Sequence, residues 1–168
     1  MLSLSNISLR RGRKVLIENV SFQVHAGQRM GLIGANGSGK SSLFAMVLGQ
    51  LEADDGEFTL DPRDEIAHVA QESPHGDGAA VDYVMDGDRE LREVQAAIAA
   101  GEASDDHPDL HLLYERLEAI DGFTANSRAS RLLHGLGFSD DDYDKPVREF
   151  SGGWRMRLNL AQALMCRS

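Results

Sequence analysis

Apolar and polar residues alternate over two stretches of the first 24 residues of the chain. A first run extends from Leu2 to Leu9 and a second from Val15 to Val24, and a turn follows at Ala26-Gly27. Because successive side chains of a strand point to opposite faces, this period of two predicts strands with one buried face. The short apolar run Met30–Ile33 predicts one more strand, which leads directly into a group of glycines.

The period changes at Lys40, where a helix is predicted. The residues spaced along one face of this helix are Leu43, Phe44, Val47 and Leu48. Gly49 comes directly after them and can end the helix. Turn-forming and acidic residues then dominate residues 54–65, with a weak strand predicted at Glu57–Leu60 and a second strand at Ile66–Ala70. Residues 72–79 have the composition of a loop.

Helical spacing returns in the second half of the chain. Leu91, Val94 and Ile98 mark one face of a helix, and the face of the next helix carries Leu110, Leu113, Tyr114, Leu117 and Ile120. The joint at residues 101–108 is polar, so the two helices are predicted to pair as a hairpin. Core packing is sufficient to explain both stripes. A third helix is predicted at Ala125–His134, and a final helix from Ser151 to the end of the chain.

Composition places the chain among folded proteins, because 42% of its 168 residues are hydrophobic and 26% are charged. The net charge of -10 and the pI near 4.9 disfavour a protein that binds the phosphate backbone of a nucleic acid without sequence specificity. Two basic clusters stand out locally, and their simplest interpretation is a solvated face. The clusters are Arg10, Arg11, Arg13 and Lys14, and then Arg148, Arg155, Arg157 and Arg167.

Cys166 is the single cysteine, which excludes a disulfide within the chain and a zinc site built from several thiolates. The first residues lack the pattern of a signal peptide, and no apolar run approaches the length of a membrane span. We therefore expect a cytoplasmic protein with no direct insertion into a membrane.

Residues 34–41 read Gly-Ala-Asn-Gly-Ser-Gly-Lys-Ser and match the phosphate-binding pattern G-x-x-x-x-G-K-[ST]. The glycines allow the backbone to aim N–H groups at an anion, and the helix that follows presents its positive end to the same anion. Lys40 is expected to reach the β- and γ-phosphates, and Ser41 to ligate Mg²⁺. The nucleotide-binding residues predicted in this loop are Gly34, Asn36, Gly37, Ser38, Gly39, Lys40, Ser41 and Ser42.

Such a loop occurs in kinases, GTPases, helicases and transport ATPases alike, so a second motif has to choose among them. Residues 150–157 read Phe-Ser-Gly-Gly-Trp-Arg-Met-Arg. Ser151 is a natural first residue for a helix, and Gly152 and Gly153 remove side chains where a ligand could approach the end of that helix. A plain capped helix is the alternative interpretation of this stretch.

In the order phosphate loop and then Ser-Gly-Gly, the chain resembles the ABC ATPase family, whose signature is usually written LSGGQ. The resemblance implies that Ser151, Gly152, Gly153 and Trp154 contact the ATP held by an opposite domain. It implies that Gln71 matches the glutamine that contacts the metal and the attacking water. Arg11 and Val15 fall where the family stacks an aromatic residue on adenine; an arginine replaces that aromatic here, and its planar group could stack instead.

The residues Trp154 to Arg157 and the helical hairpin resemble the ABC-F branch of the family, whose soluble members act on the ribosome. The implied fold class is α/β, a P-loop NTPase of ABC ATPase type that is incomplete, with an antiparallel β subdomain and an inserted helical arm. Residues 1–168 are then the first portion of an ATP-binding domain. The implied division is a nucleotide-binding core at residues 1–80, an arm at 81–124, and a helical subdomain with the signature at 125–168.

In the family, a strand with a metal-binding aspartate and a catalytic glutamate follows the signature helix, and the 168 residues hold no match to either. The expectation is a chain that binds ATP and Mg²⁺ but hydrolyses ATP only at background level, because a base that orients water is lacking. The parent protein is expected to be an ATPase.

The resemblance also implies partners, namely a second ABC domain of the same full-length chain and the ribosome with its tRNA. A different hypothesis is the ATP-binding subunit of an ABC membrane transporter, which shares the loop and the signature but carries another helical subdomain. A third, non-enzymatic hypothesis is an assembly module that binds ATP without hydrolysing it.

Overall fold

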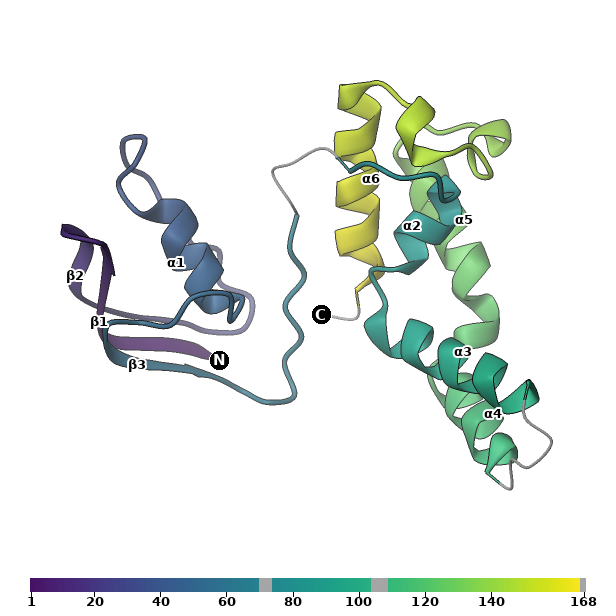
Figure 1. Cartoon of the computed structure of the whole chain (residues 1–168), viewed down its shortest axis with the longest axis horizontal. Coiled ribbons are helices and arrows are strands. Elements are labelled where there is room, and N and C mark those ends of the chain that lie inside the picture. The colour runs from purple at the N-terminus through teal and green to yellow at the C-terminus, as the bar shows by residue number, and fades with distance from the viewer. Residues whose placement is uncertain (70–73, 104–108, 167–168) are drawn as a thin grey trace. The chain divides into compact units, whose positions relative to one another are not determined.

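The computed structural model describes residues 1–69, 74–103 and 109–166. The chain forms two compact units, Met1–Ile66 and Ala67–Ser168, and each is described here by itself. Figure 1 labels their helices and strands. The predicted division at residues 80 and 124 is finer than this and remains a prediction.

The first unit is built on a three-stranded antiparallel sheet in the order β2-β1-β3. The strands are β1 (Leu2–Arg11), β2 (Lys14–Val24) and β3 (Asp55–Leu60). The first two lie where the alternating pattern predicts strands, and β3 contains the weak strand predicted at Glu57–Leu60. The antiparallel part of the predicted fold is therefore confirmed.

A bulge at Asn6 explains why the apolar residues of β1 change phase between Leu4 and Ile7. Asn6 has a left-handed backbone with φ of 53°, and the pairing of β1 with β2 shifts register between Leu4 and Ile7. The extra residue turns Ile7 back to the face that Leu4 occupies, and both are fully buried. Ser21 supports the bulge, since the Asn6 amide donates to its hydroxyl at 2.7 Å.

Helix α1 (Lys40–Val47) covers the buried face of this sheet, with Leu43 and Met46 packed into the same core as Leu4, Ile7 and Leu9. The helix ends as predicted at Gly49, which has φ of 71°. The Gly49 amide donates to the Met46 carbonyl at 3.0 Å and the Gln50 amide to the Ala45 carbonyl at 2.8 Å, the pattern of a Schellman motif.

Two predicted strands are absent from the described residues. Met30–Ile33 and residues 66–69 follow an irregular path, and Ile33 is 93% exposed; Ala70 lies outside the described residues. Runs that are apolar at successive positions are typical of strands flanked by neighbours and covered on both faces. Neither run pairs with a strand among residues 1–69, so the strand assignment from the sequence was wrong for this structure.

The second unit is helical. It contains α2 (Ala80–Met85), α3 (Arg89–Glu102), α4 (Leu110–Ala119), α5 (Ala125–Gly135) and α6 (Gly152–Met165). Three short 3₁₀ helices connect them, at Gly122–Thr124, Asp140–Asp142 and Val147–Glu149. The periodicity predicted α3, α4, α5 and α6 but not α2.

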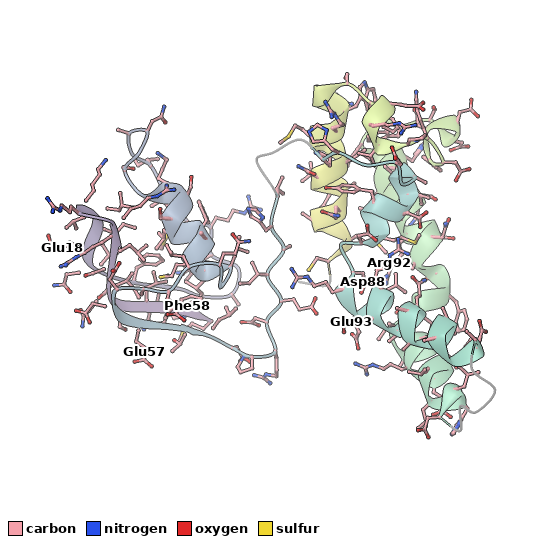
Figure 2. The ribbon with its side chains drawn as sticks, viewed as in Figure 1. Glu18, Glu57, Phe58, Asp88, Arg92 and Glu93 are labelled. Atoms are coloured by element: carbon pink, nitrogen blue, oxygen red, sulfur yellow. The ribbon has the colours of Figure 1, made fainter. Side chains whose placement is uncertain are left out.

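One core joins these helices, and its largest fully buried side chains come from α2, α3, α5, α6 and the Val147 turn. Gly87, between α2 and α3, lies so close to α6 that a β-carbon there would sit 1.9 Å from the Gln162 carbonyl oxygen. Only glycine allows this approach. Arg92, labelled on α3 in Figure 2, pairs with Asp82 at 3.1 Å and with Asp86 at 2.8 Å and ties α3 to α2.

The predicted hairpin is confirmed as α3 and α4, which pack side by side through Leu91, Val94, Ile98 and Leu117 (Figure 1). Tyr114 departs from the predicted face: it is exposed, and its hydroxyl donates to Glu102 at 2.5 Å. The hairpin tip at residues 104–108 lies outside the described residues. Within the described part of the chain, no helix has the length and apolar character needed to cross a membrane.

A candidate nucleotide-binding site

The loop at residues 34–39 curls tightly because two of its glycines adopt conformations that other residues avoid. Gly37 has φ of 76° and Gly39 has φ of 102°. The Ser38 amide donates to the Ala35 carbonyl at 3.2 Å and closes a turn inside the loop. Gly39 is buried, and a β-carbon there would lie 3.0 Å from the Leu16 side chain. The glycine pattern is therefore required both by the path of the loop and by its contact with β2.

Lys40 begins α1, and its side chain folds back over the loop. Its ammonium donates to the Gly34 carbonyl at 2.7 Å and to the Ala35 carbonyl at 2.8 Å. The cation is thus held at the centre of the curled backbone, at the positive end of a helix that has no acidic residue in its first turn. This arrangement concentrates positive potential where a phosphate group would be received.

The hairpin between β1 and β2 flanks the same loop. A turn at Gly12 and Arg13 joins the strands and places Arg11 opposite Lys14. Lys14 donates to the Gly37 carbonyl at 3.2 Å, a contact that the sequence did not predict. Arg11 and Val15, the predicted base-binding residues, are both exposed at this end of the hairpin. Only the fold reveals Lys14, because no motif spacing links it to the loop.

The residues of the first unit fit Mg-ATP in their chemistry. Backbone amides, an ammonium and the hydroxyls of Ser41 and Ser42 are groups that bind phosphate and hard cations. Ser41 is exposed in the first turn of α1, and Ser42 is half-buried beside it. Among the described residues, no cluster of three or more His, Cys, Asp or Glu is arranged for a metal ion. Of the two residues predicted to contact magnesium, Ser41 is described here and Gln71 lies outside the described residues.

The Ser-Gly-Gly motif lies at the start of α6 in the second unit. Ser151 is the N-cap of α6, as predicted, although its side chain makes no cap hydrogen bond. The serine carbonyl instead accepts from the Arg155 amide at 2.9 Å. Ser151, Gly152 and Gly153 are all exposed, and a β-carbon at either glycine would meet no atom within 4 Å. Packing within this chain does not explain the two glycines.

Trp154 is turned away from this open surface. Its ring packs edge-on against Phe138 with centroids 4.7 Å apart, and the Arg157 guanidinium lies over the ring at 4.5 Å from its centroid. Arg157 also donates to the Leu136 carbonyl at 3.1 Å. Half-buried in this stack, the indole supports the helix start. Three arginines of the second basic cluster make specific contacts, namely Arg148, Arg155 and Arg157. The fourth, Arg167, lies outside the described residues.

Comparison of the sequence with models of known protein families assigns both motifs to one family. The model of the ABC transporter family matches residues 17–168, which include both the loop and the Ser-Gly-Gly motif. Among solved structures, an ABC transporter ATP-binding protein from Pyrococcus furiosus aligns with a TM-score of 0.67 at 17% identity, over 99% of this chain and 71% of that chain. A metal-chelate type ABC transporter aligns with a TM-score of 0.63 at 19% identity, over 98% of this chain and 55% of that one. These two likenesses confirm the fold class.

Relatives found by sequence are more similar to this chain than these two structures are. The ATP-binding protein YheS of Escherichia coli K12 is 47% identical over 169 residues, covering 100% of this chain and 26% of YheS. The bovine ATP-binding cassette sub-family F member 2 is 40% identical over 164 residues, covering 96% of this chain and 25% of the relative. The chain thus spans about a quarter of the length of the curated relatives it matches. It belongs to the ABC family of ATP-binding domains, and within that family to the sub-family F branch beside YheS.

Proposed function

We propose that this chain binds Mg-ATP through its glycine-rich loop and forms part of an ABC-F ATPase that acts on the ribosome in the cytoplasm. The observation that carries the proposal is the loop of residues 34–39, curled around the ammonium of Lys40 at the start of α1. Backbone and side chain there offer donors to an anion from one compact element.

Each residue of the loop has a proposed role. Lys40 exchanges its two carbonyl partners for β- and γ-phosphate oxygens, and Ser41 ligates Mg²⁺. Gly34, Asn36, Gly37, Ser38, Gly39 and Ser42 present amides and hydroxyls to the phosphates. Arg11 and Val15 contact the base from the exposed end of the hairpin, and Gln71 contacts the metal and the attacking water.

The Ser-Gly-Gly surface is proposed to serve a second ATP, held by another ABC domain of the same protein. Support comes from its openness, since Ser151, Gly152 and Gly153 are exposed and no atom within 4 Å would block a β-carbon at either glycine. ATP bound between two domains stabilises their closed arrangement, and hydrolysis releases it.

A ribosomal role is favoured over a transporter role by the α3–α4 hairpin and by the sub-family F relatives. The test is co-sedimentation of the complete natural protein with ribosomes in ATP, using a variant that cannot hydrolyse it. Recovery in the ribosomal pellet is expected. Recovery in a membrane complex without ribosomes would establish the transporter alternative.

ATP binding itself is tested on the 168-residue chain by titration with a fluorescent ATP analogue. Replacement Lys40→Ala should weaken binding at least about tenfold, since a charge-assisted contact is lost. Lys145→Ala removes a half-buried lysine of the second unit, which pairs with Asp142 at 3.7 Å; it is the matched control and should bind as the parent does. Equal affinity in both variants would contradict the proposed site. The chain alone should turn over ATP only at background level, and a steady rate abolished by Lys40→Ala would contradict that part.

A further inference from the structure

A lysine of the hairpin between β1 and β2 is bonded to the backbone of the glycine-rich loop. Lys14 is the first residue of β2, and its ammonium donates to the Gly37 carbonyl at 3.2 Å. Two residues further along β2, the Leu16 side chain lies 3.0 Å from the place that a β-carbon of Gly39 would take. The start of β2 therefore contacts the loop at both of the loop glycines that have a positive φ.

The peptide group that joins Gly37 to Ser38 is held at both of its polar ends. The carbonyl and the N–H of a trans peptide point in opposite directions, so two different partners can bond them. Lys14 bonds the carbonyl, and the N–H of Ser38 donates to the Ala35 carbonyl at 3.2 Å. The same Ala35 carbonyl accepts from Lys40 at 2.8 Å. Lys14 and Lys40 are thus connected through one peptide group and one shared carbonyl.

The two lysines differ in what the arrival of phosphate would do to them. In the proposed function, Lys40 leaves the carbonyls of the loop for phosphate oxygens, and the loop loses the bonds that Lys40 made. Gly37 has no β-carbon to restrict the rotation of the peptide beside it. The carbonyl that Lys14 holds is an acceptor, as phosphate oxygens are, so phosphate does not compete for it. The bond from Lys14 therefore persists when Lys40 departs, and β2 fixes its origin in the sheet.

We propose that Lys14 is a positioning residue of the phosphate site, which keeps the Gly37–Ser38 peptide in one orientation both before and after ATP enters. This rests on the proposed function, in which the loop receives the phosphates of ATP. Lys14 acts through the loop backbone and leaves the loop amides to the ligand. A loop that already has its bound shape loses less conformational entropy on binding, so Lys14 strengthens the binding of the phosphate chain.

The test compares Lys14→Met with Arg13→Met in the 168-residue chain. Both replacements remove one positive charge from the same exposed end of the hairpin, and the first also removes the bond to Gly37. The probe is inorganic triphosphate, which has phosphates but no base, and its binding is measured by displacement of the fluorescent ATP analogue. Lys14→Met should weaken this binding about fivefold and Arg13→Met less than about twofold, since one hydrogen bond separates them. Lys14→Arg keeps the charge and a donor and should bind within about twofold of the parent.

A second measurement needs no ligand. Hydrogen exchange of the Ser38 amide, followed by NMR in the nucleotide-free chain, should be about fivefold faster in Lys14→Met than in Arg13→Met, because the peptide is released at its carbonyl end. The urea midpoint of unfolding should be the same in both variants, since both side chains are exposed.

Several results would overturn the proposal. Equal affinity for triphosphate in the two variants, or equal exchange of the Ser38 amide, would show that the bond from Lys14 does not hold the peptide. A loss confined to the ATP analogue would assign Lys14 to the base, and a lower urea midpoint in Lys14→Met would assign it to the stability of the sheet. If the parent binds ATP no better than Lys40→Ala does, the proposed function fails instead, and the exchange rates still decide whether Lys14 holds the peptide.

Discussion

Arg128 and Asp88 form an ion pair of 2.8 Å between α5 and the start of α3, and the carboxylate is 2% exposed. The other oxygen of Asp88 accepts the Leu91 amide at 3.1 Å and caps α3. Figure 2 labels Asp88 where α3 begins. One buried side chain thus caps one helix and attaches it to another.

Asp88→Ala should lower the free energy of unfolding by about 3 kcal/mol, because it leaves Arg128 without its partner and α3 without its cap. Urea unfolding followed by circular dichroism measures the change. Asp109→Ala is the matched control, since Asp109 begins α4 without any side-chain cap bond and is exposed. Equal losses in the two variants would contradict the role given to the buried pair.

Gly153→Ala should raise the free energy of unfolding and lower the rate of ATP hydrolysis. Nothing within 4 Å opposes a β-carbon there, and alanine loses less backbone entropy in a helix, so the free energy of unfolding should rise by about 0.5 kcal/mol. ATP hydrolysis by the complete protein should fall about tenfold or more, because the methyl group enters the surface kept open for a ligand.

Gly135→Ala provides the control for that variant. Gly135 ends α5 with equally open surroundings, and its replacement should give a similar gain in stability with unchanged hydrolysis. Unchanged hydrolysis in Gly153→Ala as well would show that the signature glycine is not needed for an approaching ligand.

Tyr83→Phe should cost about 1–2 kcal/mol in the free energy of unfolding. The Tyr83 hydroxyl donates to Oδ1 of Asn159 at 2.5 Å, and Asn159 on α6 is 2% exposed. Removing the donor takes a hydrogen bond from a buried amide oxygen. Tyr114→Phe removes a hydroxyl from an exposed ring and should change the free energy of unfolding by less than about 0.5 kcal/mol in the same urea assay.

Raising the pH into the alkaline range should lower the free energy of unfolding, because the Tyr83 hydroxyl loses its proton. Burial raises the pKa of its hydroxyl above the usual value, and the nearby Asp86 charge raises it further. The unfolded chain then releases this proton at a lower pH than the folded chain does. The stability that Tyr83 contributes is present below the unfolded pKa and is lost as pH rises through the folded pKa. Urea midpoints measured between about pH 9 and pH 11 should fall more steeply in the parent than in Tyr83→Phe.

Periodicity predicted the elements whose burial pattern is local. The alternation in β1 and the stripes Leu91, Val94 and Ile98 of α3 and Leu117 of α4 each depend on one element facing one core, so spacing alone identifies them. The motif of the glycine-rich loop was also visible, because its glycines are imposed by the chain path itself.

What the sequence did not reveal depends on distant partners. Met30–Ile33 has the composition of an interior strand, but a strand forms only where another one pairs with it, and periodicity does not report pairing. The short helix α2 has buried residues on most sides, so no stripe marks it. The contact of Lys14 with Gly37 joins residues 23 positions apart, and that of Arg155 with His75 joins residues 80 apart.

Trp154 is the single tryptophan of the chain, and it lies beside the signature glycines against Phe138 and Arg157. Tryptophan fluorescence of this chain therefore reports on one known position. Any movement of α6 relative to the Leu136–Phe138 turn changes how the Phe138 ring and the Arg157 guanidinium lie around that indole. The chain thus carries an intrinsic fluorophore in α6, next in sequence to the exposed Ser151, Gly152 and Gly153.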